Sequence, residues 1–155
     1  MSGELRNFDP DSWTVTWELA GGLGSIDLTR GLIDGPGAMV EAKDNPRWTR
    51  RADRNSNLVR NKRKPKSGSL TLTYVAEAEI QDEFSVIMGI DETTGSQVGD
   101  IVVKDNNGTT VITYRSAYIE DDPNVSMGDA AADRPYVFGF AERVAFLGGA
   151  RVAGT

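Results

Sequence analysis

The feature that most limits the possible folds is a two-residue alternation of apolar and polar side chains that recurs in three separate segments. These segments are Trp13–Leu19, residues 69–75 and residues 136–146. A period of two places successive side chains on opposite faces of a strand, so each segment is typical of a strand with one buried face. A chain with such strands near its start, middle and end builds its core from sheets, and we therefore predict a mainly β fold.

Shorter apolar runs bounded by glycine, proline or asparagine add further strands to this outline. They are predicted at residues 26–33, Met39–Lys43, 101–104 and 109–118. The last two are joined by Asn107-Gly108, which is a strong signal for a hairpin turn. Residues 48–51 are expected to pair beside Met39–Lys43.

The periodicity changes after the strand at 69–75. Apolar residues at 80, 84, 87 and 88 follow the spacing of one helix face, and Gln81 lies among the acids of the polar face. We expect a helix over residues 76–88 that ends at Gly89, because glycine is the preferred residue just after a helix. The prediction is thus a β-sandwich or small barrel of about seven strands, flanked by one α-helix and linked by long loops.

A chain of 155 residues has the ordinary size of one domain, and nothing requires a second one. We predict a single domain over 1–155, with an N-terminal arm at 1–11, a basic loop at 43–68 and a C-terminal tail at 148–155. The first ten residues lack the regions of a secretory signal, and no apolar run approaches the roughly 20 residues needed to span a bilayer. We expect synthesis in the cytoplasm and no membrane partner.

Cysteine and histidine are both absent. Their absence removes disulfides, thiolate metal sites, the commonest general base and the commonest zinc ligand. The chain has 23 acidic residues, but nothing in their spacing selects a pair for acid–base catalysis. We therefore expect no catalytic residues, no cofactor and no metal site, with an enzyme built on carboxylates as the weaker alternative.

Positive charge is concentrated in residues 43–66, where ten cations accompany only Asp44 and Asp53. The other 131 residues hold 7 basic and 21 acidic residues, a formal charge of about −14. Three interpretations stay open: this arm binds the acidic surface of another copy, it binds nucleic acid, or it is a solvated and partly disordered loop. Residues 52–67 lack periodicity, which predicts a loop of about 15 residues.

For self-association, the candidate subunit-interface residues are the cations of the arm and an adjacent apolar pair. They are Arg47, Arg50, Arg51, Arg54, Leu58, Val59, Arg60, Lys62, Arg63, Lys64 and Lys66. Two apolar residues on a cationic arm are expected of a segment that becomes ordered when it docks on a partner. Packing of Leu58 and Val59 against their own domain is an equally open interpretation.

The order of these features resembles that of the tail tube proteins of contractile-tailed bacteriophages. Arg47 to Arg54 lead into an Asn- and Lys-rich loop, which is followed by the run G-S-L-T-L-T-Y at 68–74 and then directly by the helix. In that family the segment typically reads G-[ST]-x-[TV]-L-x-L before a helix with Asp or Glu in its first turn. The match extends from Trp13 to Phe146 by order and spacing, although the tryptophan-rich first strand and the dense basic loop depart from common members.

The resemblance implies a structural virion protein that forms hexameric rings, which stack into the hollow tail tube and deliver DNA. It also implies the tail sheath, baseplate hub and tape measure protein as partners, and a location in the virion tail after synthesis in the host bacterium. An anionic lumen would let double-stranded DNA pass without binding, and Glu41, Glu77 and Glu79 are expected to face it. Open alternatives are a nucleic-acid-binding module that uses the arm at 43–66, a tail terminator and a secretion-system tube component.

Overall fold

Ten strands and one helix make up the described part of the chain. The computed structural model describes residue 5 and residues 12–19, 24–35, 37–128 and 132–149. The elements are β1 (Trp13–Leu19), β2 (Gly24–Asp27), β3 (Met39–Lys43), β4 (Trp48–Ala52), β5 (Leu58–Lys62), β6 (Gly68–Tyr74), α1 (Ile80–Thr94), β7 (Gly99–Asp105), β8 (Val111–Asp121), β9 (Arg134–Phe140) and β10 (Glu142–Phe146). Nearly all of the predicted N-terminal arm and most of the predicted C-terminal tail lie outside the described residues.

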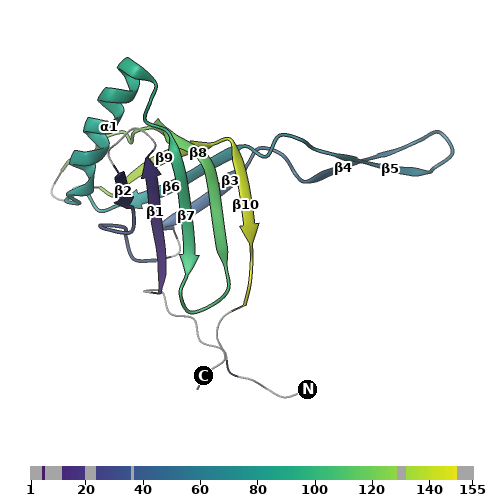
Figure 1. Ribbon diagram of the computed structural model, residues 1–155, viewed down its shortest axis with the longest axis horizontal. Helices are drawn as coiled ribbons and strands as arrows, with labels where there is room; N and C mark the ends of the chain where they lie inside the picture. Colours follow the sequence, from purple (N-terminus) through teal and green to yellow (C-terminus); the bar gives the residue numbers. More distant parts are fainter. Residues whose placement is uncertain (1–4, 6–11, 20–23, 36, 129–131, 150–155) are drawn as a thin grey trace.

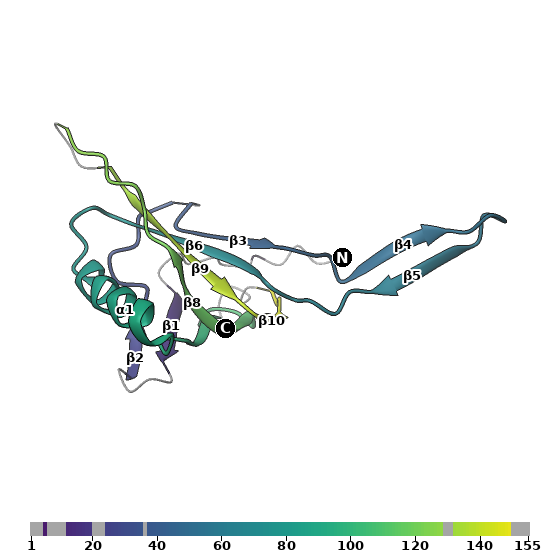
Figure 2. The ribbon, with the colours of Figure 1, turned by 90° about the horizontal axis from the view of Figure 1, so that it is seen from above.

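Eight of the strands form one bent antiparallel sheet. Its order is β2-β1-β7-β8-β9-β6-β3, and β10 also pairs with β8. The sheet folds over, so that β1, β7 and β10 lie in one layer and β3, β6 and β9 lie in a second layer (Figure 1, Figure 2). The core residues come from both layers and from α1. This arrangement confirms the prediction of a mainly β, sandwich-like fold with one flanking helix.

The bend between the layers is centred on β8, which pairs with β10 through its first half and with β9 through its second half. Its pairing with β7 shifts register near Ser116, which has a positive φ of 55° and donates its amide to Asp100 Oδ1 at 3.2 Å. An extra residue in one strand bends that strand. The single strand predicted at 136–146 is therefore wrong: β9 and β10 separate at Ala141, where they follow the bend of β8.

Aromatic side chains fill the space between the two layers and the helix. Phe84 of α1 contacts Tyr74, Tyr136 and Phe138, with ring centroids 5.4, 4.9 and 5.8 Å apart. Trp17 packs edge-on against Phe138 at 5.4 Å. The buried faces predicted at Trp13–Leu19, at 69–75 and at the start of the last strand are confirmed, because their alternating apolar side chains pack in this core. In the second half of the predicted last strand, Val144 and Phe146 are exposed instead.

The helix differs from its prediction at both ends. It begins at Ile80 rather than at residue 76, and it continues through Gly89 to Thr94. One glycine inside a helix costs only about 1 kcal/mol, which the hydrogen bonds of the surrounding turns outweigh. The residue that ends the helix is Gly95, which has a left-handed φ of 65° and donates its amide to the Asp91 carbonyl oxygen at 2.7 Å.

The sequence places Gln81 on the polar face of the helix, but the structure buries it. Its Nε2 donates to three carbonyl oxygens just before the helix. Its Oε1 accepts from Arg134 Nη1 at 2.8 Å and from Tyr136 Oη at 3.2 Å. Gln81 thus ties the start of the helix to β9, a role that helical periodicity does not reveal.

Two of the shorter strand predictions also need correction. The segment at 26–33 contributes only part of β2, because Gly31 takes a left-handed φ of 80° and Leu32 forms just an isolated bridge with Tyr74. Strand β4 pairs with β5 rather than beside β3. The strand predicted at Met39–Lys43 is confirmed as β3.

Candidate assembly interface

The predicted basic loop is a β-hairpin that projects from the sandwich. Strands β4 and β5 pair antiparallel from Trp48, opposite Lys62, to Ala52, opposite Leu58. They form a two-stranded sheet of their own, which extends away from the body (Figure 1, Figure 2). The prediction of a structureless loop of about 15 residues over 52–67 is therefore wrong.

A tight turn between the two strands closes the hairpin. Asp53 Oδ1 accepts the amides of Asn55 and Asn57 at 2.9 and 2.8 Å, and Ser56 takes a left-handed φ of 64°. Hydrogen bonds from Asn57 and Asn55 lower the pKa of Asp53. An aspartate that binds amides two and four residues ahead is a turn signal with a physical basis, and this Asp-x-Asn-x-Asn pattern is the sequence feature that reveals the hairpin.

The strands of the hairpin carry cations without acidic neighbours. Every strand residue is exposed except Thr49, which is half-buried. Arg50 lies directly opposite Arg60, and among the described residues no cation of the two strands forms an ion pair. Like charges placed opposite each other destabilise a β-pair. An acid at one of the two positions would stabilise an isolated hairpin, so this pairing does not serve the stability of the hairpin itself.

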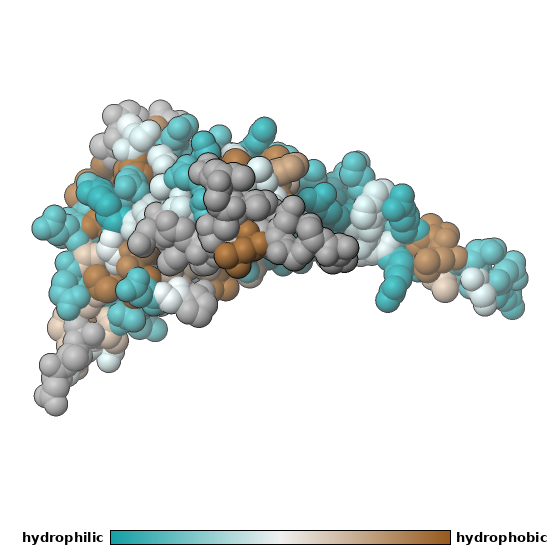
Figure 3. All heavy atoms as spheres, turned by 90° about the horizontal axis from the view of Figure 1, so that it is seen from below, coloured by the Kyte–Doolittle hydropathy of each residue, from teal (hydrophilic) through white to brown (hydrophobic). Residues whose placement is uncertain are grey.

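The larger side chains lie on two faces of the hairpin. Strand alternation places Trp48, Arg50, Leu58 and Arg60 on one face and Val59 on the other. The Arg60 guanidinium lies 4.1 Å from the centroid of the Trp48 ring, a cation–π contact. Leu58 and Val59 are 69% and 49% exposed, so they do not pack against their own domain. Figure 3 shows hydrophobic side chains on the projecting hairpin between hydrophilic ones.

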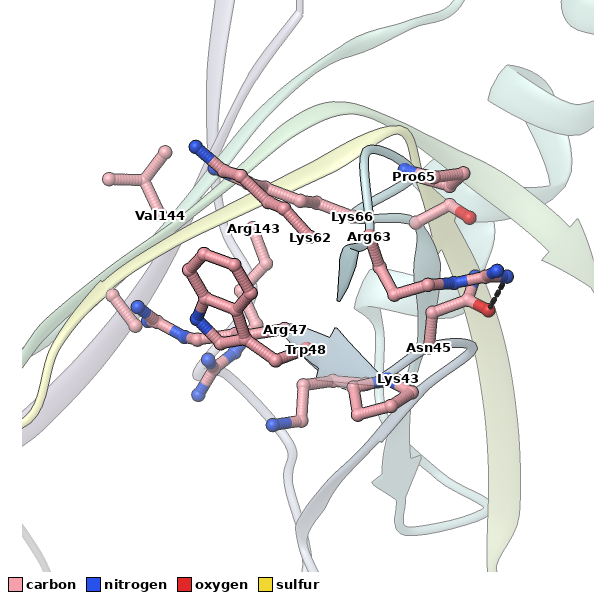
Figure 4. A pocket seen from close by; sticks show the side chains of 13 residues that line it. Lys43, Asn45, Arg47, Trp48, Lys62, Arg63, Pro65, Lys66, Arg143 and Val144 are labelled. Carbon is pink, nitrogen blue, oxygen red and sulfur yellow. Dashed lines mark hydrogen bonds between the residues drawn. The ribbon is translucent and has the colours of Figure 1, made fainter. Parts of the chain in front are cut away.

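A cationic pocket of about 410 Å³ lies at the base of the hairpin (Figure 4). Its basic lining residues are Lys43, Arg47, Lys62, Arg63, Lys66 and Arg143, and no described acidic residue lines it. Trp48 borders the same space, and Arg63 Nη2 donates to Asn45 Oδ1 at 2.8 Å (Figure 4). Such a pocket attracts a carboxylate or phosphate group of a partner.

One wall of this pocket is tied to the body by a largely buried ion pair. Arg143 of β10 donates from Nε and Nη2 to the two carboxylate oxygens of Glu41 in β3, each at 2.8 Å. Tyr114 Oη donates to Glu41 Oε2 at 2.6 Å. Strand β3 is the edge strand of one layer, and β10 lies at an edge of the other layer, where it pairs with β8. This contact therefore joins the two layers of the sandwich.

The ion pair also sets the protonation of its members. Partial burial acts to raise the pKa of Glu41, but hydrogen bonds from Tyr114 and Arg143 and the Arg143 charge outweigh it, so the pKa lies below its ordinary value. Burial and the Glu41 contact raise the pKa of Tyr114. Desolvation acts to lower the pKa of Arg143, but its contacts with Glu41 and Tyr114 hold it above the ordinary value. The carboxylate therefore stays charged at neutral pH.

The structure brings some of the predicted interface residues together and separates others. Arg47, Lys62, Arg63 and Lys66 share the pocket at the base, whereas Arg54 lies in the turn at the far end of the hairpin. Sequence reasoning missed Arg143, which reaches the pocket only because the chain bends between β9 and β10. Alternation alone carries no signal for that bend.

The three acids expected to face a lumen lie in two different places. Glu41 is half-buried in its ion pair, and Glu77 and Glu79 are exposed just before α1. Their exposure to a lumen stays a prediction. Within the described residues, no helix is long and apolar enough to cross a membrane, and no cluster of acidic side chains could hold a metal ion.

The sequence matches no protein-family model and no curated protein, whereas the fold matches solved structures from contractile injection systems. The anti-feeding prophage cap, which terminates a tube, has a TM-score of 0.61 at 8% identity, over 94% of this chain and 95% of that chain. The PVC sheath/tube terminator gives 0.58 at 12% identity, over 94% and 100%. A chain of the PVC sheath–tube complex gives 0.56 at 11% identity, over 90% and 91%. The resemblance to tube proteins is thus confirmed at the level of the fold.

Proposed function

We propose that this chain is a structural subunit of the tube of a contractile injection system and that copies of it associate through the β4–β5 hairpin. The observation that carries the proposal is a folded hairpin that, among the described residues, pairs with no strand of its own body and whose two strands expose cations but contain no acid. Its fold, which is that of tube and cap proteins, supports the same conclusion.

The body of a neighbouring copy offers the complementary charge. Outside residues 43–66 the chain holds 21 acidic and only 7 basic residues. The hairpin of one copy would therefore contact a different surface on the next copy. Heterologous contacts of this kind close into rings or continue as helical filaments, and both outcomes suit a subunit of a tube.

In its fuller form, the proposal is that six copies form a ring and that the rings stack into the tail tube of a contractile bacteriophage. DNA would then pass through the lumen, with the sheath, the baseplate hub and the tape measure protein as partners in the virion tail. The main alternative is a cap, a terminator or a secretion-system tube component, since two of the similar structures are cap or terminator proteins. Negative-stain microscopy of the purified protein separates long tubes from single rings.

Charge reversal tests the role of the hairpin. Replacing Arg60, Lys62, Arg63 and Lys64 together by Glu should leave a folded monomer that forms no rings or tubes, because the surface of the neighbouring body is also anionic. A matched control is Lys104→Glu with Arg115→Glu, which reverses two exposed cations of the sandwich. The control should assemble as the unmodified protein does. Normal assembly of the fourfold hairpin variant would show that the hairpin has no such role.

Nucleic-acid binding is the second candidate function, and the cationic pocket with Trp48 at its edge favours it. That function requires phosphate contacts, so the affinity for DNA or RNA would fall steeply as salt is added. Trp48 is the sole aromatic residue of the arm, which limits stacking on exposed bases. A gel shift that detects no binding at low salt would eliminate this alternative.

A further inference from the structure

Helix α1 and strand β2 lie at the end of the molecule opposite the hairpin (Figure 1). A groove between them is lined by apolar side chains, two acids and Arg30. Its volume is about 380 Å³, and Ile26, Val86 and Ile87 supply the apolar lining. Asp82 and Glu83 supply the acids at its edge. Val86 is 58% exposed because it lies outside the buried stripe of the helix, so the groove presents an apolar surface to solvent.

The rim of the groove retains uncompensated negative charge. Glu83 is paired with Arg30, whose Nη2 lies 3.1 Å from Glu83 Oε2. Asp82 is exposed, and among the described residues it forms no ion pair. An approaching cation therefore meets at least one free carboxylate beside an apolar floor.

The outer end of the hairpin has the complementary composition. Leu58, opposite Ala52, is 69% exposed, and Arg50 and Arg60 flank it on the same face. An apolar centre with charged neighbours is the usual arrangement of a docking surface, in which the apolar group fills a pocket and the charges fix the orientation. Burial of the leucine side chain would add hydrophobic stabilisation to such a contact.

We propose that the Leu58 end of the hairpin docks in the α1–β2 groove of a second copy of this chain, with Arg60 facing Asp82. This proposal rests on the proposed function, and it specifies the surface that receives the hairpin. In both ribbon views the hairpin lies at the opposite end of the molecule from α1 and β2 (Figure 1, Figure 2), which line the groove, so a chain cannot fill its own groove. Each copy therefore donates one hairpin and receives another, and the contact propagates head to tail.

Disulfide cross-linking tests the contact directly, because the natural chain contains no cysteine. The double variant Leu58→Cys with Val86→Cys should give a ladder of covalent oligomers under mild oxidation, and reductant should collapse the ladder to monomer. Each single variant should give at most a faint dimer. A matched control is Leu58→Cys with Val125→Cys, since Val125 is exposed to a similar extent, at 62%, on the segment between β8 and β9. A ladder from the control but not from the Val86 variant would overturn the proposal.

Charge exchange gives an independent test. Arg60→Glu and Asp82→Arg should each raise the protein concentration needed for assembly about tenfold, and the double variant should restore it. Substitution of the apolar residues by Asp separates this proposal from the more general proposal that copies associate through the hairpin. If Leu58→Asp blocks assembly while Val86→Asp does not, the hairpin mediates assembly but docks elsewhere, and the groove is wrong. If Leu58→Asp leaves assembly intact, the hairpin-based function itself fails.

Discussion

The sandwich and the hairpin differ in the burial and in the charge pairing of their strand residues. The sandwich buries aromatic and aliphatic side chains from both layers and pairs the largely buried side chain of Arg143 with Glu41. The hairpin buries none of its strand residues and places Arg50 opposite Arg60. The sandwich residues therefore stabilise their own fold through a core, whereas the hairpin, among the described residues, has only its turn, its cross-strand hydrogen bonds and one ring contact.

The difference has an energetic consequence. A two-stranded hairpin is at best marginally stable in water, because it has no core to offset the entropy lost on ordering. The β4–β5 hairpin is supported by its Asp53 turn, by cross-strand hydrogen bonds and by the Arg60–Trp48 contact. We expect it to open independently of the sandwich, so that changes in the two regions have separable effects.

The largest predicted contrast comes from removing an apolar side chain from each region. Phe138→Ala should lower the free energy of unfolding by about 4 kcal/mol, because Phe138 is fully buried and contacts both Trp17 and Phe84. Leu58→Ala should change it by less than about 0.5 kcal/mol, because Leu58 is exposed. Urea denaturation of dilute, unassembled protein measures both values. Similar losses in the two variants would show that the hairpin unfolds together with the sandwich.

The second prediction concerns the ion pair that joins the layers. Glu41→Gln should cost about 2 kcal/mol, because it leaves Arg143 largely buried without its counter-ion. The folded pKa of Glu41 lies below its unfolded value, so its contribution is complete above the unfolded pKa and disappears as the pH falls through the folded pKa. Unfolding curves between neutral and acidic pH should therefore show a weaker acid dependence for Glu41→Gln than for the unmodified protein. An unchanged acid dependence would contradict the assignment.

The sandwich was more predictable from sequence than the hairpin, for a physical reason. A strand with one buried face has a two-residue apolar period in the sequence, as at Leu70, Leu72 and Tyr74, because every second side chain must be apolar. The hairpin buries none of its strand side chains, so its strands have no such period. The Asp53 turn is the one sequence feature that indicates them. Sequence reasoning therefore gave the position and the charge of this segment but not its structure, and its role as an interface stays a prediction.

Bends and helix ends escaped prediction for a related reason. The corner at Ala141 depends on the bulge at Ser116 in a different strand, and local periodicity contains no information about that partner. At the helix, both Gly89 and Gly95 were suitable end residues by composition. Only the second takes the left-handed conformation. The choice depends on which backbone conformation the tertiary structure imposes, not on residue type.

Two left-handed residues, one in each region, give the third prediction. Gly95→Ala should destabilise the sandwich by about 1 kcal/mol, because a side chain at positive φ is strained. Ser56→Gly relieves the same strain in the hairpin turn and should slow amide hydrogen exchange in β4 and β5 without raising the unfolding midpoint of the sandwich. Urea denaturation and hydrogen exchange are measured on both variants. A raised midpoint for Ser56→Gly would show that the two regions are coupled.

The smallest predicted effect concerns the contact between Arg60 and the Trp48 ring within the hairpin. Arg50→Gln and Arg60→Gln each remove the same cross-strand repulsion between like charges, but only Arg60→Gln also removes the cation–π contact with Trp48. The difference between the two variants therefore measures the ring contact alone, which is worth about 0.5 kcal/mol at an exposed site. Amide hydrogens of β4 and β5 should exchange about twofold faster in Arg60→Gln than in Arg50→Gln, while the amides of β6 and β9 exchange at equal rates in both. Equal rates in the hairpin would mean that the stacked arginine adds nothing to its stability, and that the Trp48 ring is available to a partner.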